Sequence, residues 1–247
     1  GNYATSLIFG ETANPIWVKI FAAAIIILLT FVNSIGAETV SKVQSVIVTI
    51  VLIVLSGFAI AMLSQMNISY LAPSGYPSMT YILASVSLTF FAYLGFGVIS
   101  FVGGDIVDPK VNMPRAMYIS IGFTMLLYVA LAIGVFGTLT VSEVIANADT
   151  ALAVAAYPIF GAAGVTLISI CALFSTTGAI NSQLYASIGA TYTMAKDGQL
   201  PPVFALPRRY RPAGTQGLVI SALLILGLAL LFDVSAIASI GSAVALA

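Results

Sequence analysis

The middle of the chain contains the stretch Phe90-Phe91-Ala92-Tyr93-Leu94-Gly95-Phe96-Gly97, which lies inside an apolar run over residues 78–104. A membrane-spanning helix needs roughly 20 apolar residues, so this run is long enough to cross a bilayer. Two glycines interrupt its midpoint, and each weakens a helix interior by about 1 kcal/mol relative to alanine. The sequence therefore predicts a spanning helix that is broken at Gly95–Gly97.

A helix break at this depth has two interpretations. Free backbone N–H and C=O groups are tolerated inside a membrane only where they line a cavity or are buried in protein. In secondary transporters such a cavity is the substrate site. Alternatively, the glycines let a neighbouring helix approach closely, which is common among membrane helices. This stretch alone leaves both interpretations open.

The composition identifies the class of protein. Of 247 residues, 60% are hydrophobic and only 6% are charged, whereas ordinary globular chains are about 25% charged. The chain is therefore predicted to be an all-α polytopic protein whose surroundings are the lipid bilayer. Its eight basic and eight acidic residues give no net charge, so no nucleic-acid partner is expected. The chain starts at Gly1 and ends within an apolar run, and we expect it to be a fragment of a longer transporter.

Apolar runs predict six full spans and a partial seventh within a single transmembrane domain, residues 1–247. The predicted spans are 16–37, 43–65, 78–104, 116–140, 158–194, 216–232 and 234–247. The run 158–194 exceeds one spanning length. Its front end is therefore expected to lie on the membrane or to enter it at a tilt.

The basic residues are distributed unevenly between the two sides of the predicted membrane. Seven of the eight fall in the alternate connections 38–42, 105–115 and 195–215: Lys42, Lys110, Arg115, Lys196, Arg208, Arg209 and Arg211. Only Lys19 falls on the other side. Cytoplasmic loops of membrane proteins are enriched in Lys and Arg, so we expect these three connections to be cytoplasmic.

The predicted span 158–194 contains a second informative stretch, because seven of the ten residues 174–183 are Ser, Thr, Asn, Gln or Gly. Small residues recur every fourth position along one helix face: Gly178, Ser182, Ala186 and Ala190. Such a stripe lets another helix pack closely. The polar groups would then hold helices together.

The alternative is that part of this stretch faces a polar cavity shared with the Gly95–Gly97 break. Ser175 and Gln183 lie on a face next to the small-residue stripe. Hydroxyl and amide oxygens suit either sodium coordination or hydrogen bonds to a substrate. Ser175, Thr176 and Asn181 are the candidates for an ion site or polar cavity, and the sequence does not separate these uses.

No charged residue falls deep in a predicted span. Asp105, at the cytoplasmic end of the broken span, is a candidate for a closing contact with Arg115 or Lys196, against the alternative of a solvated carboxylate. The chain has no histidine and a single cysteine, Cys171. Without a nucleophile–base pair, metal-ligand spacing or phosphate loop, neither an enzyme nor a bound metal or cofactor is expected.

Several motifs together resemble a known family. The broken stretch is followed by Asp105-Ile106-Val107-Asp108-Pro109-Lys110 and by Met113-Pro114-Arg115. Further on come Ala148-Asp149-Thr150-Ala151-Leu152-Ala153, Phe160-Gly161 and Tyr192-Thr193-Met194-Ala195-Lys196-Asp197-Gly198-Gln199-Leu200-Pro201. Their order and spacing resemble the amino acid permeases of the amino acid–polyamine–organocation superfamily.

This resemblance implies a five-plus-five inverted-repeat fold, in which the six full spans would be the fourth through ninth helices. It also implies alternating-access transport of an amino acid across the plasma membrane. Phe91 would then be the aromatic gate over the substrate. Leu94, Gly95 and Phe96 would line the site, and Gln183 would face it from the eighth helix.

The sequence leaves several points of the function open. The coupling ion is undetermined between H⁺ and Na⁺, because positions that differ among family members are Val51, Gly97 and Gly104 here. A polyamine or organic cation carrier is the alternative within transport, although no deep acidic residue is present to bind a cation. A channel or sensor without stoichiometric transport is the alternative outside it. The sequence does not indicate the oligomeric state.

Overall fold

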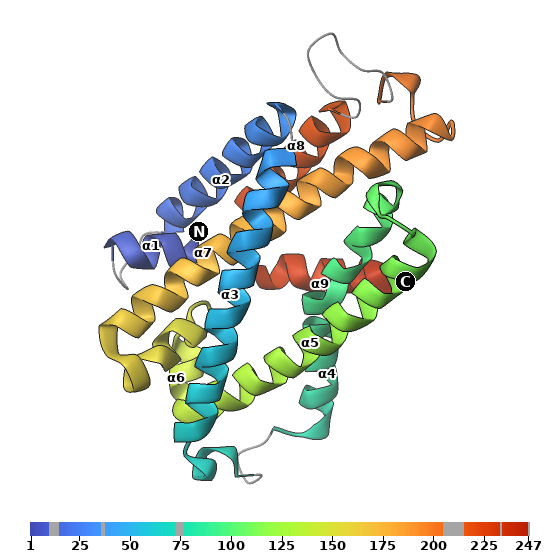
Figure 1. The fold of residues 1–247 in the computed structure, drawn as a ribbon. Coiled ribbons are helices and arrows are strands. Elements are labelled where there is room, and N and C mark those ends of the chain that lie inside the picture. The colour runs from blue at the N-terminus through green and yellow to red at the C-terminus, as the bar shows by residue number, and fades with distance from the viewer. Residues whose placement is uncertain (10–14, 36–37, 73–76, 205–214, 233, 247) are drawn as a thin grey trace.

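The computed structural model describes the whole chain except residues 10–14, 36–37, 73–76, 205–214, 233 and 247. The described residues form helices joined by short connections (Figure 1), which confirms the all-α prediction. In chain order they are α1 (Asn2–Phe9), α2 (Pro15–Ile35), α3 (Glu38–Gln65), η1 (Ile68–Leu71), α4 (Met79–Phe90), η3 (Phe91–Asp105), α5 (Pro109–Thr138), α6 (Val141–Ala146), α7 (Ala151–Lys196), η4 (Pro202–Phe204), α8 (Thr215–Leu231) and α9 (Val234–Leu246).

Four helices in the described part of the chain are long and apolar enough to cross a membrane. They contain the segments Pro15–Ser34, Gln44–Gln65, Pro109–Thr138 and Ala151–Lys196. Large apolar side chains such as Ile53, Ile60 and Leu126 are exposed on their outer surfaces. Exposed apolar bands on long helices are what a lipid solvent requires, so the chain is a multi-pass integral membrane protein.

Helix α7 is longer than one membrane crossing and is divided by Gly161. That residue has φ 62° and ψ −156°, a left-handed conformation that glycine adopts without the steric cost of a side chain. Residues 151–160 therefore form a separate short helix, and residues 162–196 form the long one. The ring centroids of Phe58 and Phe160 lie 5.9 Å apart, so α3 packs against the short part.

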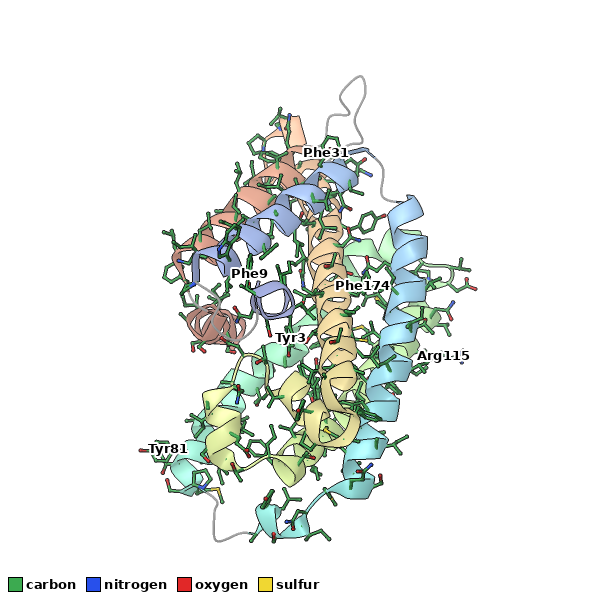
Figure 2. All side chains as sticks on the ribbon, turned by 90° about the vertical axis from the view of Figure 1, so that its left-hand side faces the viewer. Tyr3, Phe9, Phe31, Tyr81, Arg115 and Phe174 are labelled. Atoms are coloured by element: carbon green, nitrogen blue, oxygen red, sulfur yellow. The ribbon has the colours of Figure 1, made fainter. Side chains whose placement is uncertain are left out.

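The long part of α7 is the centre of the arrangement (Figure 1). Helices α2 and α8 pack along it and against each other, and α3 crosses it. Figure 2 shows α1 nearly end-on between α2 and α7, with Tyr3 and Phe9 at its two sides. On the other side of the molecule, α5 packs against α3, and η3 contacts both α5 and α7.

Glycines allow two pairs of helices to approach closely. A Cβ atom added at Gly134 of α5 would lie 2.6 Å from Met62 Cε, and one at Gly137 would lie 2.7 Å from Met66 Cβ. At the α7–α8 contact, a Cβ at Gly217 would lie 1.9 Å from Thr191 Oγ1. Small residues at such contacts are typical of membrane helix packing.

A chain of side-chain amides connects α2, α3 and α7. Asn33 Nδ2 donates to Asn181 Oδ1 at 2.6 Å and to the Leu29 carbonyl at 2.8 Å. Asn181 Nδ2 donates to Gln44 Oε1. Gln44 Nε2 donates in turn to the Gly178 carbonyl at 2.9 Å and to Ser182 Oγ at 2.7 Å. We call these three amides, Asn33, Gln44 and Asn181, the amide chain.

Helix α5 begins earlier than the sequence predicts. The helix is expected to start at Asn112 or Met113, with Pro114 in its first turn and the span itself over 116–140, whereas the observed helix starts at Pro109. Asp108 has a left-handed conformation (φ 47°), which turns the backbone. Pro109 then occupies a first-turn position, where its missing N–H is not needed. Pro114 therefore lies inside the helix, where it removes one backbone hydrogen bond.

Candidate functional site

The predicted break in the span 78–104 appears as a change of helix type. The α-helix α4 ends at Phe90, and the 3₁₀-helix η3 continues from Phe91 to Asp105. The change thus begins four residues before Gly95. A 3₁₀-helix of fifteen residues is unusual, because its hydrogen-bond geometry is poorer and such runs are mostly short.

A cavity of about 340 Å³ lies between η3 and the middle of α5. The η3 residues that line it are Ala92, Tyr93, Gly95, Phe96 and Ile99, and the α5 residues are Ala116, Met117, Ser120, Ile121, Thr124 and Tyr128. The first set follows the three-residue period of a 3₁₀-helix. The second set includes rows spaced by four, the period of one α-helical face.

The wall formed by η3 exposes main chain at Gly95. An added Cβ at Gly95 would have no neighbouring atom within 4 Å, so the space beside its backbone is open. Non-helical or weakly helical backbone at membrane depth is tolerated where it lines a cavity. Open main chain beside a cavity is the arrangement expected if the Gly95–Gly97 pair marks a substrate site.

The α5 wall contributes the polar groups of the cavity. Ser120, Thr124 and Tyr128 are spaced by four residues, which places their hydroxyls on one face of the helix. At one end the rings of Tyr93 and Tyr128 meet edge to face, with centroids 5.4 Å apart and an interplanar angle of 67°. The remaining lining residues are apolar or small, and none of the lining residues is charged.

The cavity can therefore bind a small, neutral or zwitterionic molecule. The open space beside Gly95 lets a ligand approach the main chain, the hydroxyls supply donors and acceptors, and most of the other lining side chains are apolar. Ligand sites commonly combine a mostly apolar lining with a few placed polar groups. No cluster of three or more His, Cys, Asp or Glu side chains is found among the described residues.

Sequence comparison identifies the family. Residues 1–247, the whole chain, match the amino acid permease family. The chain belongs to the amino acid permease family. This confirms the resemblance inferred from the motifs, and the family is one of transporters.

Individual relatives agree with this assignment. The permease is 39% identical to an uncharacterised protein of Methanocaldococcus jannaschii over 94% of this chain and 53% of the relative. It is 30% identical to an inner membrane transport protein of Escherichia coli over 98% of this chain and 56% of the relative. It is 28% identical to a methylthioribose transporter of Bacillus subtilis over 74% of this chain and 40% of the relative. The permease chain thus spans about half the length of the first two relatives.

Two of the predicted substrate residues on η3, Gly95 and Phe96, line the cavity. Phe96 is 42% exposed, so its ring is open on one side. The side chains of Phe91 and Leu94 lie outside the described residues, although their backbone belongs to η3. The gating role of Phe91 and the lining role of Leu94 remain predictions.

The predicted α7 residues do not line this cavity. Ser175, Thr176 and Gln183 are exposed, and Thr176 Oγ1 donates to the Ala172 carbonyl of its own helix at 2.7 Å. Asn181 instead belongs to the amide chain and is 6% exposed. The small-residue stripe behaves differently, since Gly178 and Ser182 accept hydrogen bonds from Gln44 of α3.

The predicted closing contact of Asp105 with Arg115 or Lys196 lies only partly within the described residues. Arg115 and Lys196 are exposed, and Arg115 points away from the helices at the edge of Figure 2. The side chain of Asp105 lies outside the described residues. The pairing of Asp105 with either base therefore remains a prediction.

The hydroxyls of α5 were not among the sequence candidates. A detectable signal was present, because Ser120, Thr124 and Tyr128 recur every four residues in an otherwise apolar span. That spacing alone does not say which helix the polar row faces. The position of η3 against α5 supplies this information.

Proposed function

We propose that the permease is part of a secondary active transporter that moves a neutral amino acid across the plasma membrane by alternating access. The observation that supports this most directly is the uncharged cavity against the open main chain of Gly95, within a span that changes from α to 3₁₀ geometry. In secondary transporters, discontinuous helices near the bilayer midplane bind the substrate.

We assign the zwitterionic part of the substrate to the η3 wall. Backbone carbonyls can accept hydrogen bonds from an ammonium group, and backbone N–H groups can donate to a carboxylate. The absence of a charged residue from the cavity lining argues against a polyamine or organic cation, which would need a carboxylate partner. The family name supports an amino acid, while the Bacillus subtilis relative is named for methylthioribose.

We propose an orientation in which connections 38–42, 105–115 and 195–215 face the cytoplasm. The seven-to-one distribution of basic residues supports it. The coupling ion, H⁺ or Na⁺, is to be determined by imposing each gradient separately during uptake.

Counterflow into proteoliposomes containing the full-length protein tests the proposed function. Vesicles are loaded with an unlabelled neutral amino acid, and uptake of the labelled form is followed. A carrier shows faster uptake when substrate is present on the inner side. Uptake without such stimulation would indicate a channel, and stimulation by methylthioribose or putrescine but not by amino acids would overturn the assigned substrate.

A further inference from the structure

We propose that Ser120 and Thr124 of α5 recognise the side chain of the substrate and make the permease selective for a hydroxyl-bearing neutral amino acid. This inference rests on the proposed function, because it assumes that the cavity between η3 and α5 receives an amino acid. It adds a specificity-determining surface on α5, opposite the main chain of Gly95.

Ser120, which is exposed, and Thr124, which is half-buried, both lie in the cavity lining, and neither hydroxyl has a hydrogen-bond partner among the described residues. Other threonines in the helix interiors behave differently. Thr30, Thr138 and Thr177 each donate to the carbonyl four residues earlier, at 2.7 Å in each case. That local bond is the usual way for a helical hydroxyl to be satisfied in an apolar setting.

A polar group in apolar surroundings is unfavourable unless it is hydrogen-bonded. Two such hydroxyls one helical turn apart, both lining one cavity, are placed to hydrogen-bond a ligand bound there. Each hydroxyl can both donate and accept a hydrogen bond, so the pair suits a hydroxyl group of the ligand. A ligand whose main-chain groups contact η3 would direct its side chain toward α5, because these two helices form the two walls.

Hydroxyl recognition gives a stronger preference than shape does. A site built to hydrogen-bond a substrate hydroxyl rejects an isostere that lacks it, because the buried polar groups of the site are then left unpaired. Threonine and valine have nearly the same shape and differ in one hydroxyl. The proposal therefore predicts that the permease binds threonine more tightly than valine.

The test measures the affinities of threonine and valine for the purified full-length protein by isothermal titration. Thr124→Val and Ser120→Ala should each lower the threonine affinity about 3- to 10-fold, the range expected for one net hydrogen bond, and should leave valine nearly unchanged. Thr124→Ser keeps the hydroxyl and should retain the preference. Thr138→Val is the matched control on the same helix, because Thr138 bonds its own helix and is not in the cavity lining.

The outcomes separate this inference from the proposed function. If the wild-type protein binds valine as tightly as threonine, or if folded Thr124→Val keeps the wild-type ratio, the recognition role of α5 is wrong and amino acid transport stands. If the wild-type protein binds and exchanges no amino acid, both the proposed function and this inference are wrong. Loss of the threonine preference in Thr124→Val, with its retention in Thr124→Ser and Thr138→Val, supports the inference.

Discussion

Asn33 and Asn181 lie 148 residues apart in the sequence, and their side-chain amides meet at 2.6 Å in the contact between α2 and α7. Both are nearly fully buried, with 2% and 6% of their surfaces exposed. The orientation of the amide chain is fixed at its two ends, because the carbonyls of Leu29 and Gly178 each require a donor. Asn33 Oδ1 is consequently left buried without a partner among the described residues.

We expect Asn33 and Asn181 to be energetically coupled. A double-mutant cycle with Asn33→Leu, Asn181→Leu and the double variant should give a coupling free energy of about 0.6–1.7 kcal/mol, the range measured for polar contacts between membrane helices. Unfolding in mixed micelles measures it. Replacing Asn33 in a Thr166→Val background is the control, because the Thr166 hydroxyl bonds only within α7, at the Ala162 carbonyl. Additive effects in the Asn33–Asn181 cycle would contradict the coupling.

Gly95→Val should weaken substrate binding at least tenfold without unfolding the protein. Its new side chain would enter open space and fill part of the cavity. Gly97→Val is a matched control two residues later, since its Cβ also meets no atom within 4 Å but Gly97 does not line the cavity. Isothermal titration on monodisperse full-length protein measures both. Equal affinities in the two variants would show that the main chain at Gly95 does not form part of the binding site.

Gly217→Ala should destabilise the protein by about 1–3 kcal/mol, the usual cost of overpacking. The added methyl would collide with Thr191, whose Cβ, Oγ1 and Cγ2 all lie within 2.7 Å of it. Thr191 is β-branched and cannot easily rotate away. Gly227→Ala on the same helix meets no atom within 4 Å and should be neutral or slightly stabilising. Thermal unfolding measures the stability of the two variants. Equal melting temperatures would show that the α7–α8 contact is loose enough to accept the added methyl group.

The short helix α6 should respond to acid through Glu143. Its carboxylate accepts from Thr140 Oγ1 at 2.7 Å and from the Thr140 backbone N–H at 2.8 Å, and these bonds hold the pKa of Glu143 below its ordinary value of 4.5. A lowered pKa means that the contribution to stability is complete above about pH 4.5 and is lost as the pH falls through the folded-state pKa.

Glu143→Ala should therefore lower the melting temperature at pH 7 and have less effect near pH 3. Thr140→Ala removes the same capping box and should have a similar effect at pH 7. A difference between wild type and Glu143→Ala that stays constant over this pH range would show that the ionised cap does not stabilise α6.

The orientation can be tested with single cysteines in a Cys171→Ser background. Lys196→Cys should react with an impermeant maleimide only from the cytoplasmic side, and Asn147→Cys only from the outer side. Intact cells and inside-out vesicles provide the two accessible faces. The reverse pattern would overturn the proposed topology and the assignment of the cytoplasmic connections.

Sequence reasoning identified the apolar spans because composition alone determines which segments favour lipid. It also located the region of the broken span, although the helix type changes at Phe91 rather than at Gly95. The stripe that begins with Gly178 and Ser182 was recognised as a packing surface. Its partner Gln44 was not predicted, since nothing local in the sequence relates residues more than 130 positions apart.

The candidate site was predicted on one wall only. Gly95 and Phe96 could be recognised in the sequence because they lie at an interruption of an apolar helix. Ser120 and Thr124, by contrast, are ordinary residues in a regular helix. Their importance depends on which helix they face, and that is a tertiary property. The early start of α5 was missed for a local reason, because the left-handed Asp108 before Pro109 allows a helix to begin ahead of Pro114.

The 3₁₀ geometry of η3 also has a consequence for length. Fifteen residues rise about 30 Å in a 3₁₀-helix and about 22 Å in an α-helix. Rewinding this segment into an α-helix would therefore shorten it by roughly 8 Å without altering any covalent connection. Because α5 is held against α3 by the Gly134–Met62 and Gly137–Met66 contacts, the change in length would appear as a displacement of α4 relative to α5.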